Sequence, residues 1–309
     1  MTLDAVYPRG AAPASSKGGD TVIEFFISHL RNTDFILESD PGRLLLLLPE
    51  TTEEGGAILA RRLLDQYSKG PAATKGPNPN VFAGISSIGV GGHTDQDLMG
   101  TSRITGRAGQ ITGQPILTLE SLLNQTITLQ DWIALYATLT ENEILIMARV
   151  FERVLKEPFG FMSKLAYQTE QIADRLSLDP DDREALSFWI YAMDIPRFAR
   201  SGGSAAAESP VFTSRRRKLL YQKGIELFRP VSKTEGRQSK TRWNSNLAPA
   251  VFRAAVRIRR FFGEEKDFSV PTFQAFIEEF PPQEVPTPVK NILVRTVPSD
   301  WAPFRKDLK

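Results

Sequence analysis

Two apolar runs separated by a tight turn constrain the fold of this chain more than any other feature. The runs are TDFILES and RLLLLLP, and Asp40-Pro41-Gly42 lies between them. Aspartate, proline and glycine each favour turns, so the stretch predicts two buried strands joined at this point. The first part of the chain is therefore expected to contain a sheet.

The segments around these strands extend the pattern. Residues 2–7 and 81–90 are apolar runs typical of strands, whereas residues 20–30 and 51–67 repeat apolar residues at helical spacing. The second of these helices begins with acidic residues and continues with basic ones, which suits the helix dipole. The order β-α-β-β-α-β predicts an α/β sandwich with helices over one face of the sheet.

Beyond residue 115, helical periodicity replaces this alternation. Residues 91–115 are rich in glycine and threonine, which indicates the tail of the first domain and a linker. The last residues contain too many prolines for a helix, so we expect an extended docking tail there. The chain of 309 residues is thus predicted to be an α+β protein with two domains. The predicted divisions are an α/β sandwich over 1–105, a linker over 106–115, an all-α domain over 116–270 and a proline-rich C-terminal extension over 271–309.

Composition excludes several kinds of site. The chain has no cysteine, which rules out disulfides, thiolate catalysis and cysteine metal ligands. The two histidines, His29 and His93, are far apart and belong to no spaced ligand motif, so no metal site is predicted. No apolar run reaches the roughly 18 to 20 residues that span a bilayer, and the N-terminus lacks the layout of a secretory signal. We therefore expect a cytoplasmic protein.

One region concentrates the positive charge. Residues 200–260 contain fifteen basic and three acidic residues, a net charge of +12, although the whole chain carries only +2. We expect the basic clusters there to contact an acidic protein surface, with an anionic membrane surface as an alternative and nucleic acid less favoured. The candidate contact residues are Arg215, Arg216, Arg217, Lys218, Arg257, Arg259 and Arg260. Apolar residues alternate with the arginines of the second cluster, which equally fits a helix buried on one side.

Four segments in the first 105 residues resemble those of the GGDEF family of diguanylate cyclases, in the family's order. They are LDAVY, GGDTVIEFFISHL, RLLLLLPET and GISSIGV. In active members, two signature glycines let the backbone approach the nucleotide phosphates, and the carboxylates after them bind metal and assist deprotonation of the attacking hydroxyl. Here the signature falls on Asp40-Pro41-Gly42-Arg43-Leu44, where Gly42 and Arg43 replace the carboxylates and Pro41 stiffens the turn. The resemblance therefore implies a domain without cyclase activity, and we expect neither an enzyme nor a cofactor.

Two further carboxylates correspond to positions of the family. Asp4 matches the metal-binding carboxylate of the first strand, and Asp20 matches the carboxylate with which family members read guanine. An aspartate at residue 20 also fits a simple helix N-cap. A single carboxylate leaves the developing charge of a two-metal reaction poorly neutralised, and Arg43 would compete for the place of the metal.

The motif Arg31-Asn32-Thr33-Asp34 has the register of the family's product-inhibition site. That site is an R-x-x-D motif with five residues between its aspartate and the signature, as here. The resemblance implies that Arg31 and Asp34 bind cyclic di-GMP. A guanidinium can fork onto guanine O6 and N7 or onto a phosphate, and a carboxylate can accept from guanine N1 and N2. The alternative is a surface ion pair between the two side chains.

The helical half carries a weaker resemblance. Residues 165–199 are similar to the helix pair that holds the His-Asp metal ligands of HD-type phosphohydrolases, with Met193-Asp194-Ile195 at the place of His-Asp-Ile. Asp194 then lacks its imidazole partner and cannot hold a dinuclear metal centre. The alternative is a set of ordinary core helices with Met193 in the core.

These observations predict a regulatory or scaffold protein of bacterial cyclic di-GMP signalling. Its mechanism would be that nucleotide bound by Arg31 and Asp34 changes the packing of the α/β domain against the helices. The alternative is a protein-protein interaction scaffold without nucleotide binding, which holds its partners through the basic helices and the proline-rich tail.

Overall fold

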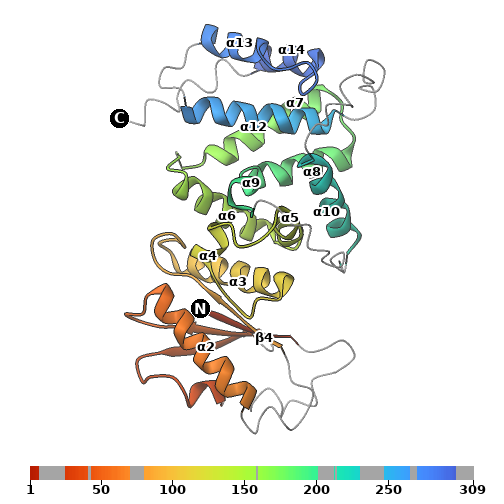
Figure 1. Cartoon of the computed structure of the whole chain (residues 1–309). Coiled ribbons are helices and arrows are strands. Elements are labelled where there is room, and N and C mark those ends of the chain that lie inside the picture. The colour runs from red at the N-terminus through yellow and green to blue at the C-terminus, as the bar shows by residue number, and fades with distance from the viewer. Residues whose placement is uncertain are drawn as a thin grey trace. The chain divides into compact units, whose positions relative to one another are not determined.

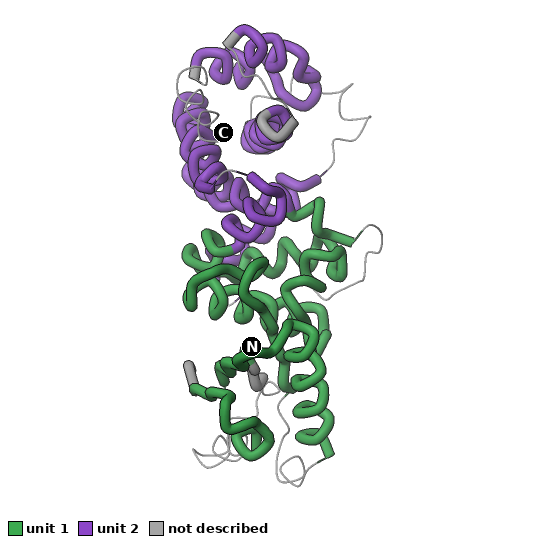
Figure 2. The backbone as a smooth tube through the Cα atoms, turned by 90° about the vertical axis from the view of Figure 1, so that its left-hand side faces the viewer, with its two compact units in different colours: residues 1–146, 195–210 green, residues 147–194, 211–309 purple. Residues whose placement is uncertain are grey.

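A computed structural model shows a mixed α+β protein that is mostly helical (Figure 1). It describes residues 1–6, 25–40, 43–69, 80–157, 159–200, 212, 214–229, 247–264 and 270–296. The contacts within the chain define two compact units (Figure 2). Unit 1 comprises residues 1–146 and 195–210, and unit 2 comprises residues 147–194 and 211–309. This division differs from the predicted domains, because residues 116–146 belong with the sheet.

Unit 1 is built on a five-stranded sheet. Its strands are β1 (Thr2–Val6), β2 (Phe35–Asp40), β3 (Arg43–Leu47), β4 (Asn80–Ile85) and β5 (Ile116–Thr118). The strand order is β2-β3-β1-β4-β5, with β4 and β5 parallel and the other neighbours antiparallel. The predicted strand pair is confirmed, since Phe35 lies opposite Leu47 and Asp40 opposite Arg43. Pro41 and Gly42, which join the two strands, lie outside the described residues.

Helix α2 (Glu53–Lys69) covers one face of this sheet. Its acidic first turn and its last-turn lysine complement the helix dipole, as the sequence predicts. Leu44 and Leu46 alternate into the core beneath it, where burial of each side chain contributes roughly 1.5 to 3 kcal/mol. The buried residues of this core are Phe26, Leu44, Leu46, Ala60, Leu63, Tyr67, Val81, Ala83 and Ile85.

Helix α3 (Asp95–Thr112) lies against the opposite face of the sheet, so helices cover both faces and not one. The hydroxyl of Thr2 donates to Ser102 O of α3 over 3.0 Å. On β4, Gly84 meets α3, whereas its neighbours Ala83 and Ile85 belong to the core under α2. Strand β4 is therefore buried from both sides.

The predicted linker over residues 106–115 is wrong, because residues 95–112 form helix α3 and residues 116–118 form β5. Thr94 caps the start of α3 by accepting from Asp97 N over 3.1 Å, and Gly113 ends the helix at a left-handed φ of 71°. The glycines and threonines that indicated a linker instead permit close packing. A Cβ atom on Gly100 of α3 would lie only 2.4 Å from Ile146 Cδ1.

Shorter helices extend unit 1 beyond the sheet. They are α4 (Leu119–Leu123), α5 (Leu129–Tyr136) and α9 (Ile195–Phe198), and the first residues of α6 (Glu141–Val154) join them.

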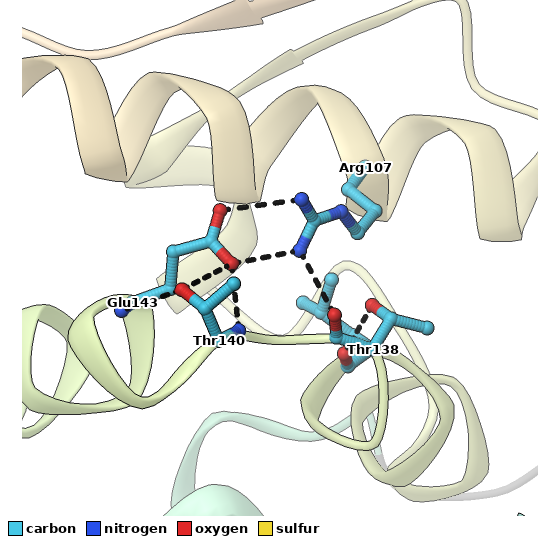
Figure 3. A network of polar contacts seen from close by, with 5 residues as sticks. Arg107, Thr138, Thr140 and Glu143 are labelled. Atoms are coloured by element: carbon cyan, nitrogen blue, oxygen red, sulfur yellow. Dashed lines mark hydrogen bonds and ion pairs between the residues drawn. The ribbon is translucent and has the colours of Figure 1, made fainter. Parts of the chain in front are cut away.

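Arg107 of α3 donates two hydrogen bonds of 3.0 and 3.2 Å to Glu143 of α6, and a third of 3.3 Å to Thr138 O (Figure 3). Burial raises the pKa of Glu143, but the positive charge of Arg107 and the hydrogen bonds from Arg107 and Thr140 lower it by a larger amount. The pKa of Glu143 is therefore below its usual value. This partly buried ion pair connects α3 to the start of α6.

Unit 2 contains helices and no strand among its described residues. These helices are the rest of α6, α7 (Phe161–Arg175), α8 (Pro180–Trp189), η2 (Ile190–Ala192), α10 (Arg215–Leu227), α12 (Ala248–Glu264), α13 (Val270–Glu278) and α14 (Thr287–Thr296). Both predicted basic helices are present as α10 and α12. Within the described ranges, no helix is long and apolar enough to span a membrane.

The prediction that residues 271–309 form an extended tail is wrong over residues 271–296, which form most of α13 and all of α14. Pro271 and Pro288 lie in the first turns of these helices, where a missing backbone N–H breaks no helical hydrogen bond. Residues 297–309 lie outside the described residues, as does the segment 201–211.

Candidate functional site

A pocket of about 340 Å³ lies between the turn that follows residue 30 and the first turns of α2. This volume is at the lower end of the range of roughly 300 to 1,000 Å³ that is usual for small-molecule sites. Its lining combines charged, hydroxyl and apolar groups. The lining residues are Arg31, Asp34, Glu50, Thr51, Thr52, Gly55, Ile58, Leu59 and Arg62. Both residues of the predicted R-x-x-D motif are therefore at this pocket.

A tight turn sets the positions of Arg31 and Asp34. Asp34 Oδ2 accepts from the backbone N–H of Arg31 over 2.9 Å, and Asp34 N donates to Arg31 O over 3.0 Å. Among the described residues, the Arg31 guanidinium forms no ion pair with Asp34, so the surface ion pair is not what the structure contains. Arg31 is exposed and Asp34 is half-buried. The aspartate thus holds the turn with one oxygen, and the arginine side chain extends from it.

Helix α2 supplies the other wall of the pocket. Thr52 Oγ1 accepts from Gly55 N over 3.1 Å, and the remaining N–H groups of this first turn give the wall a partial positive charge. Ile58 is 58% exposed and provides an apolar surface. Arg62 lies one turn further on, and its Nη2 donates to His29 O over 3.5 Å.

Arg62 is the site residue that the sequence motif did not reveal. It lies 28 positions after Asp34, so no short motif joins the two. The signal that could have found it is helical spacing, because Gly55, Ile58 and Arg62 recur every three or four residues and so share one face of α2. Two guanidiniums, a carboxylate and the start of a helix together suit a nucleotide with anionic phosphates and a base edge rich in donors and acceptors.

The segment that resembles the GGDEF signature begins with Asp40 at the end of β2 and continues with Arg43 at the start of β3. Arg43 begins β3 and lies opposite Asp40 on one side and Asp4 of β1 on the other. The residue that corresponds to the first-strand carboxylate is therefore paired in register with residue 43 of β3. Asp20 lies outside the described residues. Within the part of the chain that the structure describes, no three histidine or carboxylate side chains gather as a metal ion would require.

Asp194, at the position of the HD-type metal ligand, is buried beside a cation. Its carboxylate lies 2.6 Å from Nη2 of Arg259 on α12, and Arg259 also pairs with Glu157. Asp194 is 3% exposed and Arg259 is 2% exposed. Met193 is buried as well, as the core-helix alternative expects. A guanidinium thus neutralises the carboxylate that the resemblance would assign to a metal.

The same contact corrects the expectation that Arg259 meets a partner at the surface, since a residue buried to this degree cannot. Other predicted contact residues are also paired within unit 2. Arg216 of α10 pairs with Glu184 of α8, and Arg257 of α12 pairs with Glu284 over 2.5 Å. Arg215, Lys218 and Arg260 are exposed and Arg217 is half-buried. The acidic partner of many basic residues is therefore this chain itself.

No protein-family model, no curated protein and no solved structure matches this chain. The resemblance to the GGDEF and HD-type families therefore depends on the individual sequence segments alone.

Proposed function

We propose that this protein is a catalytically inactive, GGDEF-like regulatory protein that binds cyclic di-GMP in the pocket between Arg31 and α2. The observation that carries the proposal is the composition of that pocket. It unites Arg31 and Asp34 with Arg62, from a different element, around one cavity. The sheet sandwich of unit 1 corresponds to the GGDEF-like domain in this proposal, and the helices that follow it to the regulated part.

Each group in the pocket has a chemical counterpart in a guanine dinucleotide. Arg31 forks onto O6 and N7 of a guanine, and the free Asp34 oxygen accepts from its N1 and N2 donors. Arg62 and the first turn of α2 attract a phosphate through charge and helix dipole. Ile58 offers an apolar surface to the face of a base. Because Asp34 Oδ2 already holds the turn, the site is formed before the ligand arrives.

The absence of catalysis follows from the β2–β3 junction in this proposal. A cyclase needs flexible glycines and paired carboxylates around a triphosphate, and the chain has Pro41 and Arg43 there. Formation of cyclic di-GMP from GTP and Mg²⁺ by the pure protein would contradict this part of the proposal.

Replacement of Arg31 by alanine is expected to weaken cyclic di-GMP binding by about 2 kcal/mol, roughly 30-fold, because a bidentate guanine contact is lost. The backbone N–H that bonds to Asp34 remains, so the turn is retained. Arg62→Ala is expected to weaken binding in the same direction. Arg61→Ala is the matched control, since Arg61 is exposed on the same helix but does not line the pocket. Isothermal titration calorimetry of the full chain measures all four affinities.

Asp34→Asn separates the two tasks of this residue. The asparagine Oδ1 can still accept from Arg31 N, but its NH₂ group faces the guanine donors, so the turn persists while affinity falls by about tenfold or more. Cyclic di-AMP, whose bases lack O6 and the N1 and N2 donors, is expected not to bind. Equal affinities for wild type and Arg31→Ala, or no binding by wild type, would rule out a receptor at this pocket.

A second candidate function, docking of an acidic protein, is favoured by one face of α10. Arg215, Lys218, Gln222 and Ile225 follow one another at helical spacing and are all exposed. Arg216 and Lys223, on the side toward α8, pair with Glu184 and Asp182. Among the described residues, no ion pair involves Arg215 or Lys218. A stripe of two cations ending in an apolar residue suits an acidic, amphipathic segment.

Charge reversal tests this alternative. Arg215→Glu combined with Lys218→Glu is expected to weaken binding of a synthetic acidic amphipathic peptide by about tenfold at low salt, with a smaller effect at high salt. The control is Arg61→Glu combined with Lys156→Glu, which changes the net charge equally at exposed positions elsewhere. Fluorescence anisotropy of the labelled peptide gives both affinities. If the two double variants bind alike, the α10 face is not a docking surface.

A further inference from the structure

Glu53 begins α2 and points away from the pocket that its neighbours line. Thr51, Thr52 and Gly55 belong to the pocket wall, and Glu53 does not. Its Oε1 instead accepts from the backbone N–H of Glu120 over 2.8 Å, and its Oε2 accepts from the hydroxyl of Ser87 over 3.0 Å. One turn of helix therefore separates the pocket from a contact with α4 and with the loop after β4.

The bond to Glu120 matters because α4 has only five residues. A helix this short has no stability of its own, and most of its N–H groups lack an intrahelical partner. Thr118 caps one of them by accepting from Ser121 N over 3.0 Å. The Glu53 carboxylate satisfies a second, and its negative charge complements the positive end of the helix dipole. The Glu53 side chain of α2 thus helps to hold α4 in place, together with the packing of its buried leucines.

We propose that Glu53 couples occupation of the nucleotide pocket to the order of α4. This inference rests on the proposed function, since the ligand is the cyclic di-GMP assigned to that pocket. A phosphate held by the first turn of α2 fixes the backbone of Thr52 and its neighbours, and with it the Glu53 side chain. A fixed carboxylate keeps the Glu120 N–H bonded. The coupling is reciprocal, so the intact bond also strengthens nucleotide binding.

Hydrogen–deuterium exchange of the full chain, with and without cyclic di-GMP, tests the coupling. In wild type the nucleotide is expected to slow exchange severalfold in peptides that cover residues 116–124. Glu53→Ala is expected to abolish this protection and to weaken nucleotide affinity about fivefold, at the lower end of usual coupling factors. Glu54→Ala is the matched control. It removes the same charge from the next residue, which is exposed and outside the pocket lining, and it is expected to behave as wild type.

Ser87→Ala provides a second, milder variant in case Glu53→Ala fails to fold. It removes one of the two bonds to the carboxylate and is expected to reduce the protection of residues 116–124 by a smaller factor. Wild type that binds nucleotide without any change in this exchange would overturn the coupling and leave the receptor proposal intact. Equal behaviour of Glu53→Ala and Glu54→Ala would do the same. Absence of nucleotide binding in wild type would overturn both.

Discussion

Replacement of Arg259 by alanine is expected to lower the free energy of unfolding by about 3 to 5 kcal/mol, the usual cost of removing one partner from a buried ion pair. The cost arises because Asp194 and Glu157 lose the cation that neutralises them. Asp194 is only 3% exposed, so water cannot replace the guanidinium. The expected result is a lower midpoint of urea or thermal unfolding, with Trp189 of the same unit, itself fully buried, as the fluorescent reporter.

Arg260→Ala is the matched control for this variant. Arg260 is the next residue on α12 and is exposed, so its replacement is expected to change stability by no more than about 0.5 kcal/mol. The contrast also separates two views of the RIRR segment. If Arg259 were a surface residue that contacts a partner, Arg259→Ala and Arg260→Ala would be equally stable, and Arg259→Ala would bind the partner more weakly. Equal unfolding midpoints for the two variants would show that Arg259 does not neutralise a buried carboxylate.

The strands and the first long helix of unit 1 could be predicted because their signals are local. The turn formers at residues 40–42 and the alternation at Leu44 and Leu46 fix a strand pair within fifteen residues of sequence. The acidic first turn of α2 marks its start in the same way. The R-x-x-D motif is local too, and its two residues do line one pocket.

The elements that sequence reasoning missed depend on packing between distant segments. Helix α3 contains Gly100, Gly106 and Gly109, which lower its intrinsic helix propensity and so resemble a linker. What stabilises it is the sheet, since small residues let α3 approach the sheet closely enough for Thr2 of β1 to donate to Ser102 O. That approach depends on a strand more than ten residues away in sequence. A prediction that considers only a short stretch of sequence around α3 does not include this strand.

The candidate site and the basic helices show the same limit. Arg62 joins Arg31 and Asp34 only once α2 folds back beside the turn. The excess charge of residues 200–260 indicated an external acidic partner, yet Glu184, Glu284 and Asp194 of this chain pair with three of the seven candidate residues. A count of charges identifies which residues are basic, but only the fold determines which of them remain accessible.

Replacement of Gly84 by alanine is expected to destabilise unit 1 by about 3 kcal/mol or more, because an added Cβ would collide with backbone atoms of α3. The Cβ would lie 2.0 Å from Ser102 O and 2.3 Å from Gly106 N. Neither atom belongs to a flexible side chain, so relief requires that helix and strand move apart. Such a shift would disrupt the bond from Thr2 to Ser102 and the packing of β4 against α3. Calorimetric or urea unfolding of the variant measures the loss.

Gly56→Ala tests whether this loss comes from the backbone collision and not from the general effect of adding a methyl group. Gly56 is also buried in unit 1, but its Cβ would meet only the Cγ2 methyl of Ile85 at 3.2 Å, a contact that a shift of a few tenths of an ångström relieves. Alanine also gains up to about 1 kcal/mol over glycine inside a helix. We therefore expect Gly56→Ala to stay within about 1 kcal/mol of wild type. If Gly84→Ala were as stable as Gly56→Ala, α3 could not pack this closely on β4, and the placement of residues 95–112 against the sheet would be wrong.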